Sequence, residues 1–152
     1  MLWVGKTRNA SLGTLIEDYL ERINRLVPCG IQETRDVQRG KGVRAEKAVE
    51  AEAGLLERAL KPGELLVALD ERGCEYSSLE FARWLDAVGK RGVREIVFMI
   101  GGPDGIAPRV RQRAHLTLSL GRMTWTHEMC RVLLLEQIFR SLCILRNIPY
   151  HR

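Results

Sequence analysis

A glycine-rich turn follows one of the most apolar segments of the sequence. The turn spans residues 101–105 (GGPDG), directly after the apolar run 96–100. Open parallel sheets bind ligands at the carboxyl ends of their strands, and glycines let backbone amides approach a ligand closely. The same spacing also suits a tight strand-to-helix turn without a ligand, so both interpretations remain open. The turn matches neither GxGxxG nor GxxxxGK[ST], so a Rossmann dinucleotide site and a P-loop are not predicted.

Few other side chains have the spacing of a known catalytic motif. Asp70 ends a second apolar run, 65–69, where an aspartate can face a ligand, form a turn or cap a helix. His127 and Glu128 begin the zinc-protease motif HExxH, but Arg131 stands where the second histidine is required. The cysteines form no CxxC pair and the histidines are scattered, so we expect reduced thiols and no metal site.

Basic residues gather in two segments near the glycine turn. Arg109, Arg111 and Arg113 alternate just after it, and the segment 38–44 (QRGKGVR) reads as a flexible basic loop. The formal net charge is +5, which favours a polyanionic partner. Either cluster can be a solvated surface or a set of phosphate contacts, and composition alone does not decide between them.

The last three residues combine an aromatic ring, a titratable group and a permanent cation. They are Tyr150, His151 and Arg152. Chain ends usually fray, so chemistry at this tail requires a pocket that holds it.

Helical and strand-like segments alternate along the chain without a repeat or linker, which predicts one α/β domain over residues 1–152. Two buried apolar runs separated by a helix imply a right-handed crossover and a parallel sheet covered by helices on both faces. The expected strands are 2–4, 31–37 (a polar edge strand), 65–69, 96–100 and 116–120. The expected helices are one capped by Ser11, then 45–60, 78–89, 109–113 and 129–146.

The last of these helices is apolar on more than one side, and one sheet cannot cover it entirely. A helix of this kind in a chain of 152 residues favours burial against a second copy. We therefore expect a homodimer. No apolar run is long enough for a membrane span, and the first residues lack an export signal, so we expect a cytoplasmic protein.

Several blocks of the sequence, in order, resemble the RlmH family of SPOUT methyltransferases, which modify a pseudouridine of bacterial 23S ribosomal RNA. The resemblance covers nearly the whole chain. The blocks that carry it are 68–70 (ALD), 100–105 (IGGPDG), 118–127 (LSLGRMTWTH), 131–140 (RVLLLEQIFR) and 150–152 (YHR).

The resemblance implies an α/β SPOUT fold whose carboxyl-terminal part forms a trefoil knot, with S-adenosylmethionine held by the knot loops. It also implies a homodimer in which the neighbouring subunit completes each active site. Carried over by motif, the cofactor contacts would be Leu69, Gly101, Leu120, Gly121, Arg122, Met123, Thr124 and Trp125.

The reaction that the resemblance implies is an in-line transfer of the sulfonium methyl to N3 of a pseudouridine, which requires alignment and no metal. We hypothesise that Tyr150 and His151 position the base, that Arg152 stabilises developing negative charge, and that His127 lines the site. Ribosomal RNA, within the assembled ribosome, would be the substrate. The competing interpretation is a non-catalytic RNA- or ribosome-binding protein on the same fold, and S-adenosylmethionine binding separates the two.

Overall fold

Five parallel strands form one sheet in the order β2-β1-β4-β3-β5. The computed structural model describes residues 1–37 and 45–151. The strands are β1 (Leu2–Val4), β2 (Gln32–Thr34), β3 (Leu65–Glu75), β4 (Ile96–Ile100) and β5 (Leu116–Ser119). The helices are α1 (Ala10–Asn24), α2 (Ala45–Ala59), α3 (Ser78–Lys90), α4 (Pro108–Arg113) and α5 (His127–Leu145).

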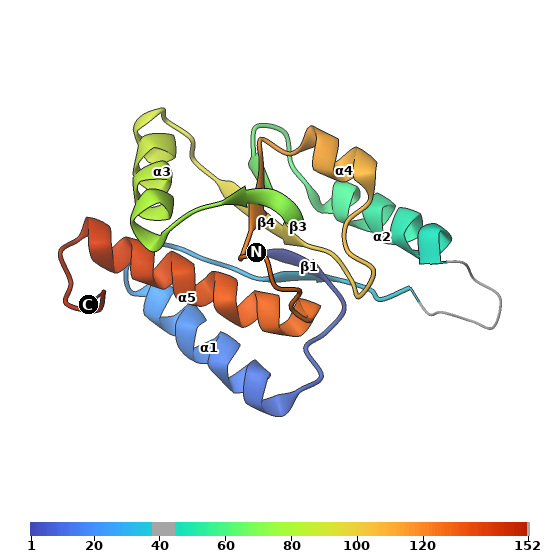
Figure 1. Ribbon diagram of the computed structural model, residues 1–152, viewed down its shortest axis with the longest axis horizontal. Coiled ribbons are helices and arrows are strands. Elements are labelled where there is room, and N and C mark those ends of the chain that lie inside the picture. The colour runs from blue at the N-terminus through green and yellow to red at the C-terminus, as the bar shows by residue number, and fades with distance from the viewer. Residues whose placement is uncertain (38–44, 152) are drawn as a thin grey trace.

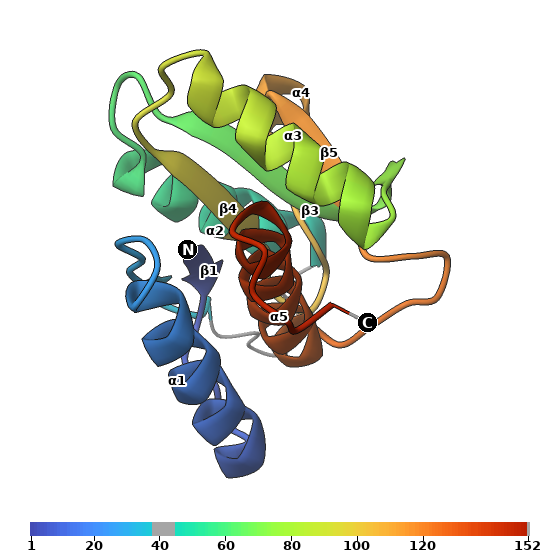
Figure 2. The same cartoon turned by 90° about the vertical axis from the view of Figure 1, so that its left-hand side faces the viewer.

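The helices cover both faces of the sheet, as Figures 1 and 2 show. Helices α1, α3 and α5 lie on one face, and α2 and α4 lie on the other. Because side chains alternate along a strand, β3 serves both cores: Val67 and Leu69 pack with the first group of helices, whereas Leu66 and Ala68 pack with the second. The prediction of an α/β parallel sheet with helices on both faces is confirmed.

Most predicted elements lie where the sequence pattern put them, and the differences are at their ends. Ser11 is not the cap of α1, since Asn9 accepts the hydrogen bond from the Leu12 amide at 3.1 Å. Helix α5 begins two residues before the predicted start, because Thr126 caps it by accepting from the Met129 amide. The predicted basic loop 38–44 lies outside the described residues.

Strand β3 continues well past its apolar run because it bends beside β5. Its pairing with β5 shifts register between Leu69 and Cys74, and such bulges re-aim side chains. Gly73 permits the approach, since a Cβ there would lie 2.6 Å from the Thr117 carbonyl oxygen. Residues 70–72 lie within this irregular part of β3.

Helix α5 lies between α1 and α3, as the end-on view of Figure 2 shows. These two helices and the sheet bury Leu134, Leu135 and Ile138 within one chain. The remaining apolar exposure near its end is at Leu145 and Ile148, 39% and 38% exposed. The chain itself therefore covers much of the apolar surface of α5, on which the prediction of a homodimer was based. The homodimer stays a prediction. The trefoil knot also stays a prediction. No helix within the described ranges is long and apolar enough to cross a membrane.

Candidate functional site

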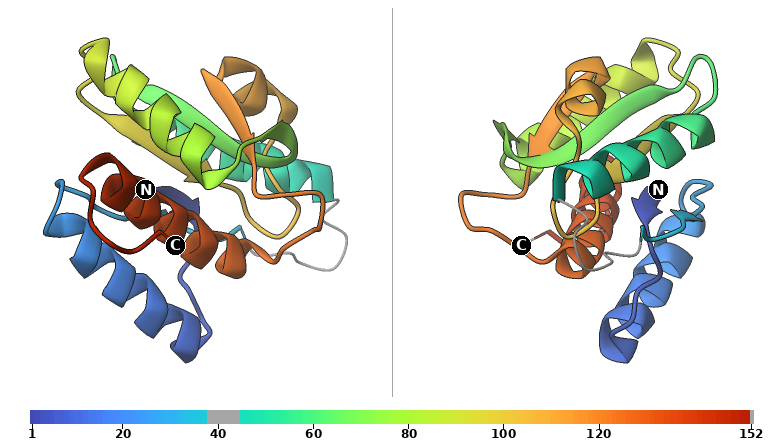
Figure 3. Two further views of the ribbon diagram at one scale, coloured as in Figure 1. Left: turned by 60° about the vertical axis from the view of Figure 1, so that its left-hand side comes forward. Right: turned by 90° about the vertical axis from the view of Figure 1, so that its right-hand side faces the viewer.

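A pocket of about 710 Å³ opens beside the carboxyl ends of β3, β4 and β5. Its volume is typical of sites for small molecules or cofactors. Three chain segments form its walls: 70–72 within β3, 101–106 after β4 and 120–125 after β5. The first turns of α2 and α5 complete the rim, and Figure 3 shows how these strand ends converge.

The glycine turn forms the wall next to β4. Gly105 has a φ of +82° and its amide donates to the Gly102 carbonyl at 3.0 Å, which closes a tight turn. Gly101 is buried, and a Cβ there would lie 2.1 Å from the Gly105 carbonyl oxygen. The sequence left open a binding loop or a plain turn, and the structure contains a tight turn that lines a pocket.

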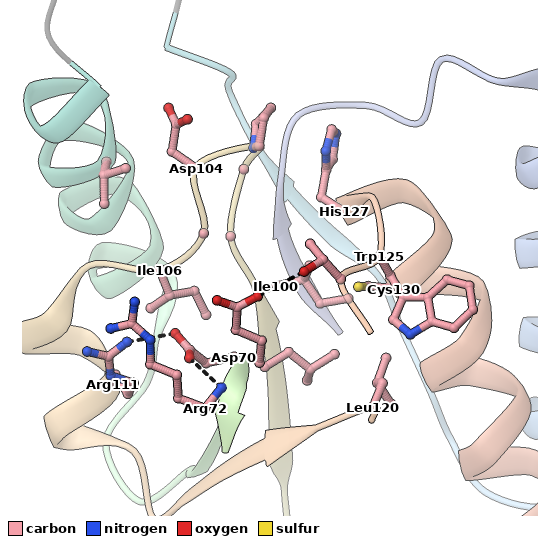
Figure 4. A pocket seen from close by; sticks show the side chains of 18 of the residues that line it. Asp70, Arg72, Ile100, Asp104, Ile106, Arg111, Leu120, Trp125, His127 and Cys130 are labelled. Carbon is pink, nitrogen blue, oxygen red and sulfur yellow. Dashed lines mark hydrogen bonds and ion pairs between the residues drawn. The ribbon is translucent and has the colours of Figure 1, made fainter. Parts of the chain in front are cut away.

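The segment after Leu69 is fixed by an ion pair at the pocket wall. Asp70 accepts from the Arg72 amide at 2.9 Å and from Arg111 Nη1 at 2.7 Å. Figure 4 shows Asp70 between these two arginines. The Asp70 side chain is only 11% exposed, so the pair is partly protected from solvent. Asp70 therefore shapes the turn and also lines the pocket.

The segment 120–126 covers the pocket from the side of β5. Gly121, with a φ of +114°, donates its amide to Ser119 Oγ at 3.2 Å, which turns the chain sharply after the strand. Thr124 then donates its hydroxyl to Glu71 Oε2 at 3.1 Å. This bond joins the segment to the wall that residues 70–72 form.

The first turn of α5 is held firmly against the ends of β1 and α1. Arg131 is fully buried and donates to the Val4 carbonyl at 2.6 Å and to Thr7 Oγ1 at 2.8 Å. The Glu128 carboxylate accepts from the amides of Arg8 and Asn9 at 2.9 and 3.1 Å. The hydrogen bond from the Arg8 amide is the main cause that lowers the pKa of Glu128. These contacts fix where His127 meets the pocket.

The arginines of α4 are engaged by carboxylates of the protein. Arg109 binds Glu50 and Glu57, and Arg113 binds Glu57 at 2.8 Å. Although burial alone would raise the pKa of Glu57, hydrogen bonds from the two arginines lower it. Together with the pair of Arg111 described above, this cluster holds α4 to α2 and β3 and does not form an open basic surface.

The residues expected to hold the cofactor do come together. All of them line the pocket except Arg122, which is exposed. Met123 and Trp125 are 72% and 41% exposed at the mouth, and Figure 4 shows the indole of Trp125 pointing away from Asp104 and the glycine turn. Among the residues expected to act on the base, His127 lines the pocket.

The tail does not reach the pocket of its own chain. The Tyr150 hydroxyl donates to Glu136 Oε1 at 3.1 Å, and Arg140 lies over its ring. Glu136 is about 14 Å along α5 from His127, at roughly 1.5 Å per residue. Burial raises the pKa of Tyr150, and the bonds to Tyr19 and Glu136 raise it further. Figure 1 shows the carboxyl end of the chain far from the first turn of α5.

His151 lies beside Arg140, with Nδ1 at 3.4 Å from a guanidinium nitrogen, and it does not line the pocket. Arg152 lies outside the described residues. The structure thus separates His127 from Tyr150 and His151 within one chain.

Sequence reasoning missed several residues of the pocket. Glu71 directly follows Asp70, and its place just after the apolar run 65–69 was an available signal. No pattern pointed to Ile106, to Cys130 or to the residues that α2 contributes, Ala45, Glu46, Val49 and Glu50. Helix α2 reaches the pocket only because the fold packs it beside the glycine turn.

The pocket suits a ligand with a flat apolar part and a polar, charged part. Leu69, Ile100 and Leu118 supply apolar surface, while the turns supply backbone groups and carboxylates. Across 1–37 and 45–151 no three His, Cys, Asp or Glu side chains are arranged to hold a metal ion. Burial raises the pKa of the Cys130 thiol, which disfavours a thiolate nucleophile there.

Comparisons with known proteins agree on one family. A family model described as "Predicted SPOUT methyltransferase" matches residues 1–151. A protein of Cereibacter sphaeroides named ribosomal RNA large subunit methyltransferase H is 46% identical over 156 residues, covering 98% of this chain and 95% of that protein. A protein of the same name from Phocaeicola vulgatus is 37% identical over 151 residues, covering 99% and 96%.

Two solved structures share the fold at low sequence identity. A probable methylase family protein from Haemophilus influenzae superposes with a TM-score of 0.58 at 12% identity, covering 99% of this chain and 69% of that one. A probable methyltransferase from Bordetella pertussis gives a TM-score of 0.56 at 13% identity, covering 93% and 94%. At such identities the likeness concerns the fold alone.

Proposed function

The chain belongs to the SPOUT methyltransferase family and, within it, to the group of ribosomal RNA large subunit methyltransferases H, and from this premise we propose that it methylates N3 of a pseudouridine in 23S ribosomal RNA with S-adenosylmethionine. The observation that carries the proposal is the convergence of residues 70–72 of β3 and the turns after β4 and β5 on one pocket.

The pocket fits the proposed cofactor in size and chemistry. Leu69, Leu118 and Leu120 provide apolar surface for an adenine ring, and the turn at Gly101 brings backbone close to the ligand. The cofactor, when bound, supplies a methyl group on a sulfonium. The chain's own residues would hold it, exclude water from the walls and leave the mouth beside His127 open to a base.

His127 would hydrogen-bond to the base at the mouth of the pocket, because it lines the pocket on the first turn of α5. Tyr150 and His151 would position the base, and Arg152 would stabilise negative charge that develops on it. Since Tyr150 is held on α5 about 14 Å from His127, we propose that the tail serves the pocket of a second subunit in a homodimer.

The substrate proposed is ribosomal RNA in the assembled particle, in the cytoplasm. The net charge of +5 supports a polyanionic partner. The assembled particle would supply recognition of the site that is modified.

The test is transfer of a tritiated methyl group from S-adenosylmethionine to ribosomes from a strain that lacks the modification, followed by mapping of the labelled base. Label at N3 of one pseudouridine is expected. Binding of S-adenosylmethionine without any transfer to ribosomes or free RNA would refute the proposed activity.

The composite site can be tested separately by mixing two inactive variants. Gly101→Ala damages the pocket and Arg152→Ala damages the tail. Random exchange of subunits would restore about a quarter of the wild-type activity, because half of the dimers would hold one intact site of two. No recovery after verified exchange would show that each chain uses its own tail.

A further inference from the structure

The carboxylate of Glu71 bridges two walls of the pocket. Glu71 follows β3's apolar run on one wall, and its Oε2 accepts the Thr124 hydroxyl, from the wall formed after β5, at 3.1 Å. Both residues line the pocket. A ligand that fills the space between these walls must therefore pass beside this carboxylate or replace its bond to Thr124.

Glu71 differs from two other carboxylates of the same pocket. Asp70 is held by Arg111 at 2.7 Å, and Glu50 is held by Arg109 at 2.7 Å. No lysine, arginine or histidine among the described residues forms an ion pair with Glu71, which accepts a hydrogen bond from a neutral hydroxyl. Within 1–37 and 45–151, therefore, no basic side chain neutralises its negative charge.

Thr124, the partner of Glu71, also lies close in sequence to His127. Thr124 precedes His127 by less than one helical turn of sequence, and both line the pocket. The ligand's transferable methyl group must lie near His127 if His127 contacts the base. In the arrangement proposed below, the sulfur that carries this methyl group lies on the Glu71 side of the ligand.

We propose that Glu71 selects the cationic methyl donor over its neutral thioether product, S-adenosylhomocysteine. The inference rests on the proposed function, since it assumes that the pocket binds this donor. The two ligands share their adenosine, ammonium and carboxylate groups and differ in the methyl group and positive charge on sulfur. A carboxylate beside the sulfur stabilises the donor complex and not the product complex, and so promotes exchange of product for donor.

The size of the effect follows from the exposure of Glu71. It is exposed in the free protein, so water screens its charge, and the attraction is between that of a surface ion pair and that of a buried one. Replacement by glutamine keeps the shape and the bond to Thr124 but removes the charge. We expect Glu71→Gln to weaken binding of the donor about fivefold and of the product less than twofold.

The experiment is calorimetric titration of the full-length protein with S-adenosylmethionine and with S-adenosylhomocysteine. Wild type, Glu71→Gln and Glu75→Gln are compared at about 50 mM and about 500 mM salt, which changes the screening of exposed charges several-fold. Glu75→Gln is the matched control, because Glu75 is an exposed glutamate of β3 that does not line the pocket. High salt should reduce the preference of the wild type for S-adenosylmethionine over S-adenosylhomocysteine. The ratio of the two affinities in Glu71→Gln should stay unchanged.

Each outcome is decisive. A selective loss of donor affinity in Glu71→Gln, absent from Glu75→Gln, supports the inference. An equal loss for both ligands means that Glu71 contacts a group they share, and no loss means that it contacts neither; both overturn the inference but not the proposed function. Failure of the wild-type protein to bind either ligand would overturn both.

Discussion

Alanine at position 101 is expected to disable the pocket, although Gly101 does not have a left-handed backbone. Other residues can adopt the backbone conformation of Gly101, but the structure leaves no room for their Cβ atom. A Cβ at Gly101 would lie 2.1 Å from the Gly105 carbonyl oxygen, 2.4 Å from the Gly105 carbonyl carbon and 2.9 Å from Ile106 Cγ1. Two of these atoms belong to the backbone and cannot rotate away.

The size of the disturbance follows from these distances. Ordinary contact begins at 3.4 Å, so the turn must open by more than 1 Å, roughly, to admit a methyl group. Opening strains the bond of 3.0 Å between the Gly105 amide and the Gly102 carbonyl. Overpacking of this kind costs about 1–3 kcal/mol of unfolding free energy. Displacement of a binding wall by about 1 Å should lower the affinity for S-adenosylmethionine by a factor of roughly ten or more.

The matched control is Gly105→Ala in the same turn. A Cβ at Gly105 would meet nothing within 4 Å, but the φ of +82° disfavours alanine by about 1–2 kcal/mol. Gly101→Ala should therefore melt about 2–12 °C lower than wild type, and Gly105→Ala about 2–8 °C lower. Only Gly101→Ala should lose most of its calorimetric affinity for S-adenosylmethionine, while Gly105→Ala should stay within about threefold of wild type.

Equal affinities of Gly101→Ala and wild type, with normal melting, would refute the reasoning. They would mean that the turn accommodates a methyl group without moving, or that its position does not matter for the ligand. Equal losses in both variants would point to strain of the turn as the cause and not to crowding at Gly101.

Three further predictions concern the supports of the site. Glu128→Gln should lower the free energy of unfolding in urea at pH 7 by about 1 kcal/mol. The control Glu17→Gln, at an exposed position of α1, should leave it unchanged. Folding lowers the pKa of Glu128 from 4.5, so this stabilisation is present above pH 4.5 and is lost as the pH falls through the pKa of the folded state. If wild type and Glu128→Gln still differed in unfolding free energy by the same amount at about pH 2, the role given to Glu128 would be wrong. Tyr150→Phe should lower methyl transfer by about tenfold or more and leave S-adenosylmethionine affinity within twofold; parallel losses would place the tail in cofactor binding. A double-mutant cycle on Asp70→Asn and Arg111→Gln should give a coupling of about 1 kcal/mol in unfolding, and additive losses would show that the pair contributes nothing.

Local sequence determined the elements of the fold because their signals lie within a few residues of each other. The apolar runs 65–69 and 96–100 appear as central strands, and the polar segment around 32–34 appears at the edge of the sheet. The family blocks identified the turns that line the pocket, with Arg122 as the exception. The cap of α1 was misplaced because Ser11 and Asn9 have similar cap propensities, and tertiary contacts of the Asn9 amide with Glu128 favour the earlier start.

Relations between distant segments were decided by tertiary structure. The sequence suggested that Arg109, Arg111 and Arg113 contact phosphates. No local pattern indicates that these arginines form ion pairs with Glu57 and Asp70. The sequence likewise did not indicate which elements cover the apolar surface of α5, and the structure shows that α1 and α3 flank it.

The sequence by itself determined which residues make strands, helices and turns and which family they belong to, since periodicity and motif order are properties of the linear chain. The fold alone decided that Glu71 meets Thr124 across a pocket and that Tyr150 rests on Glu136, away from His127. These pairs depend on strand order and helix packing, and such long-range geometry is set by burial of the whole core and not by any local signal.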